Sequence, residues 1–166
     1  MKVVAGVAPA DVDALVRLHG ELYWKEYRYD RRFEAYVAAG LTEMVLRYDA
    51  ARDGLWILKE KGHIIGSVAI VHHSQRSAQL RWFLVAPAFR RKGLGKHLMK
   101  AALRFARSAG YREVFLWTTS ELDAARHVYE NAGFRKTARK THAVWGRQNI
   151  TEERYALKLR KTTPAA

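Results

Sequence analysis

Hydrophobic positions in the first part of the chain recur at the spacing of α-helices. From Pro9 onward, apolar and then aromatic residues repeat three and four positions apart, which predicts an amphipathic helix. A second repeat over Phe33 to Leu46 predicts another helix, and Gly40 is a position at which this helix can break into two pieces. The N-terminal quarter is therefore expected to be helical.

Beyond these helices the period changes to that of β-strands. Apolar runs over 55–58, 63–71 and 78–85 are separated by a Lys61-Gly62 turn and by a polar turn over 74–77. This pattern predicts a meander of three antiparallel strands.

The second half of the chain alternates helical and extended patterns. A helical repeat over Leu94 to Ser108 closes at Gly110, and the apolar run Val114 to Thr118 predicts a buried strand parallel to the one before it. Another helical repeat over 122–132 stops at Gly133. A strand-helix-strand crossover therefore follows the meander.

Two strand-like runs, over 135–144 and 154–159, flank a polar stretch that contains Asn149, and they predict a closing hairpin. The sequence shows no internal repeat, linker or low-complexity tract. We therefore expect one α+β domain over 1–166, with its core at about 3–159 and a mostly antiparallel sheet.

Charge and cysteine content narrow the classes of function. Thirty Lys and Arg against sixteen Asp and Glu give a formal net charge of +14, which favours polyanionic partners, although a solvated basic surface explains the charge equally well. The absence of cysteine excludes disulfides, thiolate metal sites and a covalent thioester relay. Residues 1–5 are too short for a signal peptide or a membrane span, so we expect a cytoplasmic protein.

The segment Leu84 to Lys96, between a strand and a helix, carries the strongest chemical signal. Gly93 and Gly95 allow the backbone to approach a ligand closely, and the first amides of the helix face outward beside the cations at 90–92. This arrangement predicts an anion site suited to a pyrophosphate. The alternative is a basic turn with a glycine-assisted helix start. The Walker and dinucleotide-binding patterns are both missing.

The chain resembles the GNAT superfamily of N-acetyltransferases over Val3 to Leu159. The resemblance is carried by Val85-Ala86-Pro87, by Arg90-x-x-Gly93-x-Gly95, by the strand at 114–118, and by the segment from Ala125 to Phe134. More closely, Leu80 to Val85, Phe115 to Thr118, Leu122 to His127 and Trp145 to Arg147 are similar to the acetyltransferase half of MarR-type regulator fusions.

The resemblance implies acetyl-coenzyme A as the cosubstrate and assigns roles to individual residues. Backbone groups of Leu84 and Val85 would bind the pantetheine arm where the central strands separate, and their amides would hold the thioester oxygen. Tyr129 would protonate the departing thiolate as general acid, the alternative being a core aromatic residue. The residues expected to wrap the pyrophosphate are Arg90, Arg91, Lys92, Gly93, Leu94, Gly95 and Lys96.

One departure from the family concerns the pantetheine contact. Many members carry asparagine seven residues before the tyrosine, where this chain has Leu122. Thr118, Thr119 and Ser120 are candidate substitutes for the missing amide.

The general base and the acceptor side are less defined. The central strand has Arg81 and Trp82 where the family often has a glutamate, so the candidate bases are the helical Glu21, Glu26 and Glu34, each otherwise a solvated helix charge. His72, His73 and His142 are candidates for the acceptor side, without spacing typical of a metal site. Trp24, Trp82 and Trp145 are candidate pocket walls or packing residues.

These observations favour an N-acetyltransferase that moves an acetyl group to a primary amine of a small molecule or peptide, by direct attack in a ternary complex and without a metal. The alternatives are a non-catalytic acetyl-coenzyme A sensor and a basic nucleic-acid-binding protein. The net charge favours a small acceptor, an amino acid, or an acceptor carrying carboxylate or phosphate. We further expect nonspecific binding to nucleic acid, no membrane partner and, by analogy, a homodimer.

Overall fold

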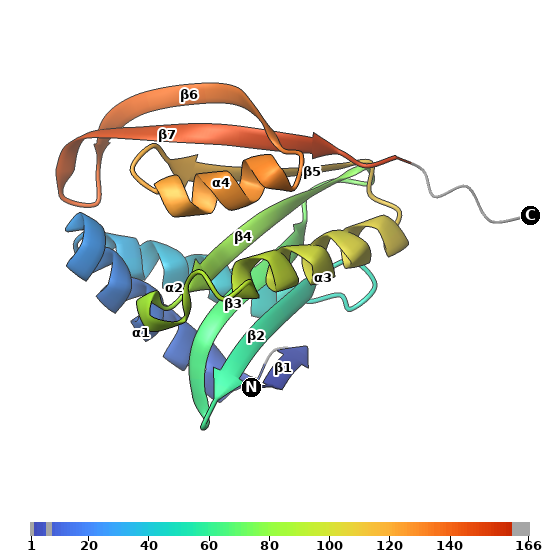
Figure 1. Ribbon diagram of the computed structural model, residues 1–166, viewed down its shortest axis with the longest axis horizontal. Helices are drawn as coiled ribbons and strands as arrows, with labels where there is room; N and C mark the ends of the chain where they lie inside the picture. The colour runs from blue at the N-terminus through green and yellow to red at the C-terminus, as the bar shows by residue number, and fades with distance from the viewer. Residues whose placement is uncertain (1, 6–7, 161–166) are drawn as a thin grey trace, which may run out of the picture.

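The computed structural model describes residues 2–5 and 8–160, and within them seven strands form one sheet in the order β1-β2-β3-β4-β5-β7-β6 (Figure 1). All neighbouring strands are antiparallel except β4 and β5, which are parallel. The strands are β1 (Lys2–Ala5), β2 (Gly54–Glu60), β3 (His63–His72), β4 (Ser77–Val85), β5 (Glu113–Thr119), β6 (Arg135–Val144) and β7 (Arg147–Lys158).

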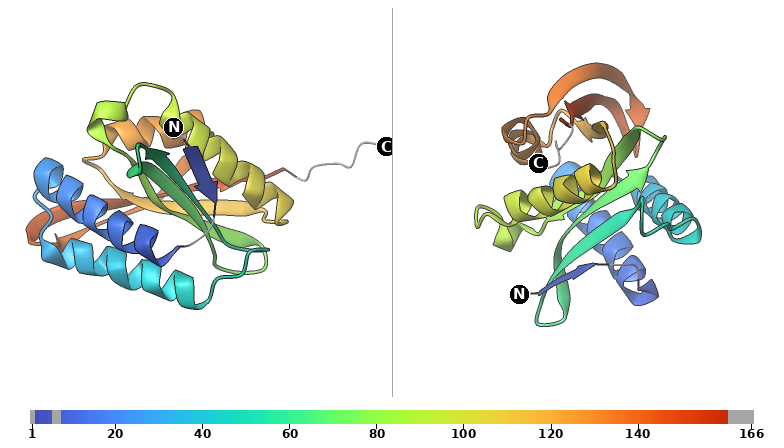
Figure 2. Two further views of the ribbon diagram at one scale, coloured as in Figure 1. Left: turned by 90° about the horizontal axis from the view of Figure 1, so that it is seen from below. Right: turned by 90° about the vertical axis from the view of Figure 1, so that its right-hand side faces the viewer.

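Helices cover both faces of the sheet. Helices α1 (Pro9–Tyr27) and α2 (Arg31–Leu46) lie on one face, and α3 (Leu94–Ser108) and α4 (Asp123–Asn131) lie on the other (Figure 2). Each face has its own hydrophobic cluster, because each pair of helices buries an apolar stripe against the sheet. This architecture confirms the predicted α+β class.

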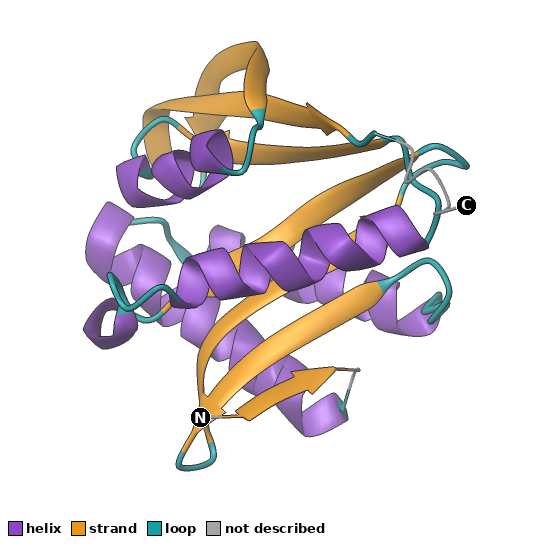
Figure 3. Ribbon diagram, turned by 45° about the vertical axis from the view of Figure 1, so that its right-hand side comes forward, coloured by secondary structure: helices purple, strands orange, loops and turns teal. Residues whose placement is uncertain are grey.

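The parallel pair β4–β5 is short, and this determines where a ligand can enter the sheet. The two strands pair only over Ser77–Gln79 and Glu113–Phe115, and from there β4 continues beside β3 alone. Figure 3 shows β4 and β5 converging at one end and separating at the other. The separation that the sequence resemblance implied is therefore present.

The structure corrects three predictions about elements. Helix α2 runs without a break through Gly40, whose missing side chain leaves room for Arg81, because a Cβ there would lie 2.7 Å from Arg81 Nη2. The polar stretch with Asn149 belongs to β7, which already begins at Arg147 after a two-residue turn. Strand β1 was missed, because four residues are too few to show a strand period.

No helix in the described part of the chain has the length and apolarity needed to cross a bilayer.

Candidate active site

The loop from β4 to α3 presents backbone amides and cations to one open surface. Gly93 is the N-cap of α3 with φ +77, a left-handed conformation that glycine adopts without strain, and no side chain caps the helix. The amides of residues 94–96 therefore have no acceptor within the helix. Leu94 itself is buried in the core, so only its backbone can face a ligand.

The basic residues of this loop differ in how firmly they are held. Arg91, Lys92 and Lys96 are exposed. Arg90 instead donates from Nε to the Val85 carbonyl oxygen at 2.9 Å and forms an ion pair with Glu26 of α1, with Nη1 and Oε1 2.8 Å apart. Arg90 thus ties the loop to α1, whereas its exposed neighbours remain available to an anion.

The end of β4 lies where the sheet opens. Leu84 is buried and Val85 is half-buried, and both lie beyond the part of β4 that pairs with β5. Gly95 packs closely against β4, because a Cβ there would lie 3.2 Å from the Phe83 ring and 3.8 Å from Val85 Cγ2. The strand end and the start of α3 are therefore in direct contact.

Tyr129 of α4 lies between this opening and a cavity. Its ring packs 5.5 Å from Phe83 and 6.3 Å from Tyr155, measured between ring centroids, and its side chain is 5% exposed. Burial raises the pKa of the Tyr129 phenol well above its usual range. The group stays protonated at any physiological pH, as a proton donor must.

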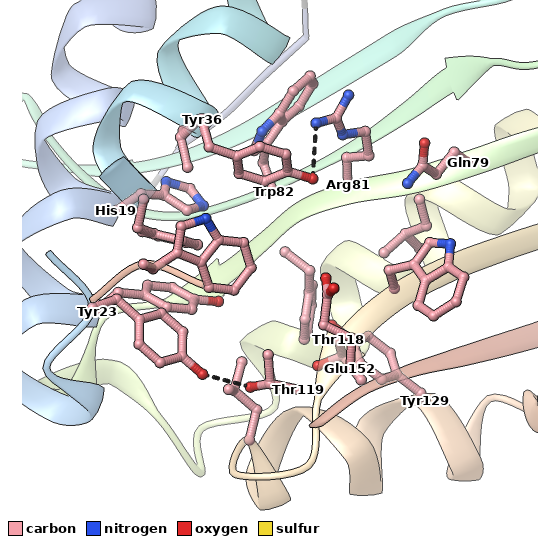
Figure 4. Close-up of a pocket in the computed structure, with 18 residues that line it drawn as sticks. His19, Tyr23, Tyr36, Gln79, Arg81, Trp82, Thr118, Thr119, Tyr129 and Glu152 are labelled. Atoms are coloured by element: carbon pink, nitrogen blue, oxygen red, sulfur yellow. Dashed lines mark hydrogen bonds between the residues drawn. The ribbon is translucent and has the colours of Figure 1, made fainter. Parts of the chain in front are cut away.

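The cavity next to Tyr129 has a volume of about 100 Å³ and a mainly aromatic wall (Figure 4). Helices α1 and α2, strands β4, β5 and β7 and the β6–β7 turn all contribute to it. Its principal aromatic residues are Tyr23, Tyr29, Phe33, Tyr36, Trp82 and Trp145.

A bulge in β4 shapes one side of this cavity. The pairing with β3 shifts between Ser67 and Ala69, and Trp82 opposite has φ +47, unusual for a bulky residue. Adjacent strand residues normally point to opposite faces. Here the guanidinium of Arg81 lies 4.5 Å from the centre of the Trp82 ring, and both residues line the cavity.

The residues around the missing family asparagine are also in place. Leu122 lines the cavity, as do Thr118 and Thr119. Thr119 Oγ1 accepts a hydrogen bond from the Tyr29 hydroxyl at 2.9 Å, whereas Thr118 Oγ1 is buried without a partner among the described residues. Thr118 is therefore the better of the candidate substitutes. Ser120 is outside the cavity wall.

Several residues singled out from the sequence lie elsewhere. Glu21, Glu34 and Trp24 line a second hollow, which is formed by α1, α2 and the connection between them, and Glu26 is paired with Arg90. The histidines at 72, 73 and 142 do not line the cavity. Within the described residues, no group of His, Asp and Glu side chains is arranged to hold a metal ion.

Three polar residues of the cavity were missed, namely His19, Gln79 and Glu152. His19 lies inside a helical repeat, where a histidine gives no sign of its orientation, and Glu152 lies in the stretch assigned to a loop. Glu152 contacts His142 Nε2 at 2.5 Å and Lys140 Nζ at 3.2 Å. The apolar Ile150, which is buried inside the stretch assigned to a loop, is the signal that could have extended β7 back over Glu152.

This geometry agrees with the comparison to known proteins. The model of the acetyltransferase (GNAT) family matches residues 19–134, which include the loop, the separating strands and Tyr129. The chain belongs to this GNAT family.

Relatives and solved structures of this GNAT chain agree with that assignment. Human N-acetyltransferase 8 is 27% identical over 130 residues, covering 75% of this chain and 55% of that protein. Human N-acetylaspartate synthetase is 33% identical over 125 residues, covering 71% of this chain and 41% of that protein. The chain thus spans about half the length of the curated relatives it matches.

Among solved structures, yncA from Salmonella typhimurium, described with its cofactor acetyl-CoA, superposes with a TM-score of 0.73 at 18% identity, covering 100% of this chain and 99% of that one. At this identity the likeness concerns the fold alone, and it confirms the GNAT-like sheet.

Proposed function

We propose that this chain is an acetyl-coenzyme A-dependent N-acetyltransferase that acetylates a primary amine of a small molecule or peptide. One observation carries the proposal: the separation of β4 and β5 lies between the glycine-started N-terminus of α3 and an aromatic cavity that Tyr129 lines. A phosphorylated thioester and an amine can therefore approach the same point from two sides.

The residues present fit acetyl-coenzyme A. The open amides of residues 94–96, with Arg91, Lys92 and Lys96 around them, suit a pyrophosphate, since a helix N-terminus with nearby cations stabilises an anion. Backbone groups of Leu84 and Val85, together with the unpartnered Thr118 hydroxyl, suit the amide-bearing pantetheine arm. Arg90 would contribute to phosphate binding only by giving up Glu26, so its first task is to position the loop.

When bound, acetyl-coenzyme A supplies an activated acetyl group. Backbone amides at the end of β4 would polarise the acetyl carbonyl, and the Tyr129 hydroxyl would donate a proton to the leaving sulfur. The cavity would hold the amine in line for direct attack, so that most of the acceleration comes from positioning.

The first test is calorimetric titration with acetyl-coenzyme A at about 0.15 M salt, comparing Gly93→Asp with Gly93→Asn. Both side chains tolerate the left-handed conformation similarly, and nothing lies within 4 Å of a Cβ there, so the pair differs mainly in charge. We expect the Asp variant to bind at least ~10-fold more weakly than the Asn variant, because a carboxylate would face the phosphates. Equal affinities, or no binding by the folded parent, would refute the proposed site.

The second test is Tyr129→Phe, which keeps the ring packing and removes the proton donor. We expect kcat to fall ~100-fold or more with unchanged affinity for acetyl-coenzyme A, since general acid catalysis contributes about 10²–10⁴-fold. Full activity of the variant would assign Tyr129 to packing. Acetyl-coenzyme A binding by the parent without transfer to any amine would favour a sensor.

Further parts of the proposal rest on the sequence. They are a single domain over 1–166, a cytoplasmic location, a homodimer, a small-molecule acceptor, and the closer resemblance to the acetyltransferase half of MarR-type fusions.

A further inference from the structure

Arg81 of β4 places a fixed positive charge in the wall of the aromatic cavity. Its guanidinium stacks 4.5 Å from the centre of the Trp82 ring and lies 3.4 Å from the Tyr36 hydroxyl, measured from Nη2 (Figure 4). It also packs against Gly40 of α2, where any side chain would collide with it. These three contacts hold the side chain in one place without neutralising it.

Arg81 differs from three other arginines near the site in having no counter-ion in the described part of the chain. Each of these three arginines contacts a glutamate within 3.2 Å. The pairs are Arg90–Glu26, Arg147–Glu121 and Arg154–Glu113. Within the described residues, none of the ion pairs includes Arg81. A guanidinium half-enclosed by aromatic rings and without a counter-ion is well prepared to bind one from a ligand.

The charges of the cavity wall indicate which anion fits. Among the described residues that line the cavity, Arg81 is the one Lys or Arg. His19 adds no charge near neutral pH, because burial lowers its pKa to about 4. One positive charge matches a carboxylate better than a doubly charged phosphate. Gln79, two residues before Arg81 and thus on the same face of β4, offers a further donor.

The opposite side of the cavity suits an amine. Among the described residues that line the cavity, Glu152 of β7 is the one Asp or Glu, and in Figure 4 it lies beside Thr118, across the cavity from Arg81. Its Oε2 already contacts Lys140 and His142, so an amine would bind by sharing this carboxylate. Aromatic rings such as those of Phe33 and Trp145 line the same cavity. The wall is therefore complementary to a molecule with a carboxylate, an amine and an apolar side chain.

We propose that the acetyl acceptor is an amino acid or similar amine with an apolar or aromatic side chain, and that Arg81 binds its carboxylate. This inference rests on the proposed acetyltransferase function and deepens it by naming the acceptor class and a specificity-determining residue.

The test uses matched pairs of acceptors, each an amino acid and the amine that remains when its carboxylate is removed: phenylalanine and phenethylamine, tryptophan and tryptamine, leucine and isopentylamine. We expect the parent to show at least ~10-fold lower KM for the carboxylated member of a pair. Arg81→Gln is expected to raise that KM ~10- to 100-fold, the worth of one charged hydrogen-bonded contact, and to leave the KM of the plain amine nearly unchanged.

Two variants serve as controls. Arg81→Lys keeps the charge and should restore part of the preference, which a purely structural role of Arg81 would not predict. Arg139→Gln removes the same charge from the exposed face of β6 and should leave both KM values unchanged. Equal effects of Arg81→Gln on both members of every pair, or no preference by the parent for any carboxylated member, would overturn the proposal.

A binding measurement separates this proposal from the acetyltransferase function. Tryptophan fluorescence of Trp82 and Trp145 should report binding of phenylalanine or leucine without any turnover. Binding that Arg81→Gln abolishes supports the carboxylate site even in a chain that transfers nothing. Failure of the proposed function would show instead as loss of acetyl-coenzyme A binding, and absence of amino acid binding together with absence of turnover would overturn the acceptor class.

Discussion

At the scale of single residues, the most informative groups are polar side chains buried beside the cavity without a full set of partners. His19 is 2% exposed, and its Nδ1–H donates to the Leu15 carbonyl oxygen at 2.9 Å. Nε2 is then a lone-pair acceptor without a partner among the described residues. Such a site remains favourable only while the imidazole is neutral.

His19 should therefore make stability depend on pH. The pKa of His19 in the fold is lowered to about 4 by burial, against about 6.5 in an unfolded chain, so protons bind preferentially to the unfolded state. The stabilisation is complete above pH ~6.5 and is lost as the pH falls toward ~4, by a total of ~3 kcal/mol.

The comparison with His19→Gln isolates this effect from the titration of carboxylates. Denaturant unfolding from pH 7 down to pH 4 should show the free energy of unfolding of the parent falling more steeply than that of the variant. A difference between the two proteins that stays constant with pH would contradict a buried neutral imidazole.

The sequence was sufficient to predict an unusual backbone conformation, but not the direction of side chains. Gly93 was expected to adopt such a conformation at the strand-to-helix junction, and it does so with φ +77. Arg81 and Trp82 line the same cavity because Trp82 has a positive φ, and no local sequence pattern predicts this conformation. Glu152 was missed for a related reason, since its assignment depended on where β7 begins.

At the scale of elements, the β6–β7 hairpin closes the cavity by docking its tip on the α1–α2 connection. The Trp145 carbonyl oxygen accepts from the Asp30 amide at 3.0 Å, and Arg147 Nη1 donates to the Tyr27 carbonyl oxygen at 2.7 Å. Gly146, with φ +80, lies against the Asp30 side chain, where a Cβ would be 2.6 Å from Oδ2. The tip and the helical connection therefore fit only without a side chain at 146.

Gly146→Ala should therefore lower the free energy of unfolding by more than the strain of an alanine in the left-handed conformation. The Asp30 carboxylate that would have to move also caps α2, accepting from the Arg32 amide at 3.0 Å, and loss of such a cap costs ~1 kcal/mol. Gly62→Ala is the matched control, because Gly62 has φ +81 in the β2–β3 turn and nothing lies within 4 Å of a Cβ there.

We expect Gly62→Ala to lower the free energy of unfolding by ~1–2 kcal/mol and Gly146→Ala by ~1 kcal/mol more. Only Gly146→Ala should raise the KM for the acceptor, because it displaces the wall formed by Trp145. If chemical denaturation shows equal losses of stability for Gly62→Ala and Gly146→Ala, and the KM for the acceptor is unchanged, the contact between the hairpin tip and Asp30 does not stabilise the cavity wall.

Most elements could be predicted because their burial in the core determines the spacing of apolar residues along the sequence. Strand β4 alternates buried and half-buried residues, and helices such as α2 and α3 repeat buried positions, whereas β2, β3 and β5 were recognisable as apolar runs that are mostly buried. The strand β6 is exposed along nearly its whole length and was found only as part of a hairpin, while the start of its partner β7 was misplaced. Periodicity fails where a strand has no buried face.

At the scale of the whole molecule, the net charge of +14 dominates the behaviour toward polyanions. Four of the thirty basic residues are exposed on the edge strand β6, namely Arg135, Lys136, Arg139 and Lys140. Charged side chains on an edge strand oppose pairing with the edges of other molecules. Protection of this strand edge from pairing therefore explains the basic residues of β6 without a nucleic-acid partner.

Binding to DNA should accordingly be weak, indifferent to sequence and sensitive to salt. Neutralising about four phosphates predicts a ~100-fold loss of affinity between about 0.05 and about 0.2 M salt. Fluorescence anisotropy with two unrelated duplexes measures this directly. Affinity that persists at the higher salt, or a preference for one duplex, would favour the nucleic-acid-binding alternative.

The long-range contact between the hairpin tip and the first two helices also affects how the chain acquires its structure during synthesis. Arg147 and Tyr27 are 120 residues apart, and pairings of such separation form late because a large loop must close first. The ribosome releases α1 and α2 long before their aromatic partner Trp145 emerges. In the nascent chain Tyr29 and Phe33 are therefore uncovered apolar surface, and this pair of helices is a segment that a chaperone would bind until Trp145 is in place.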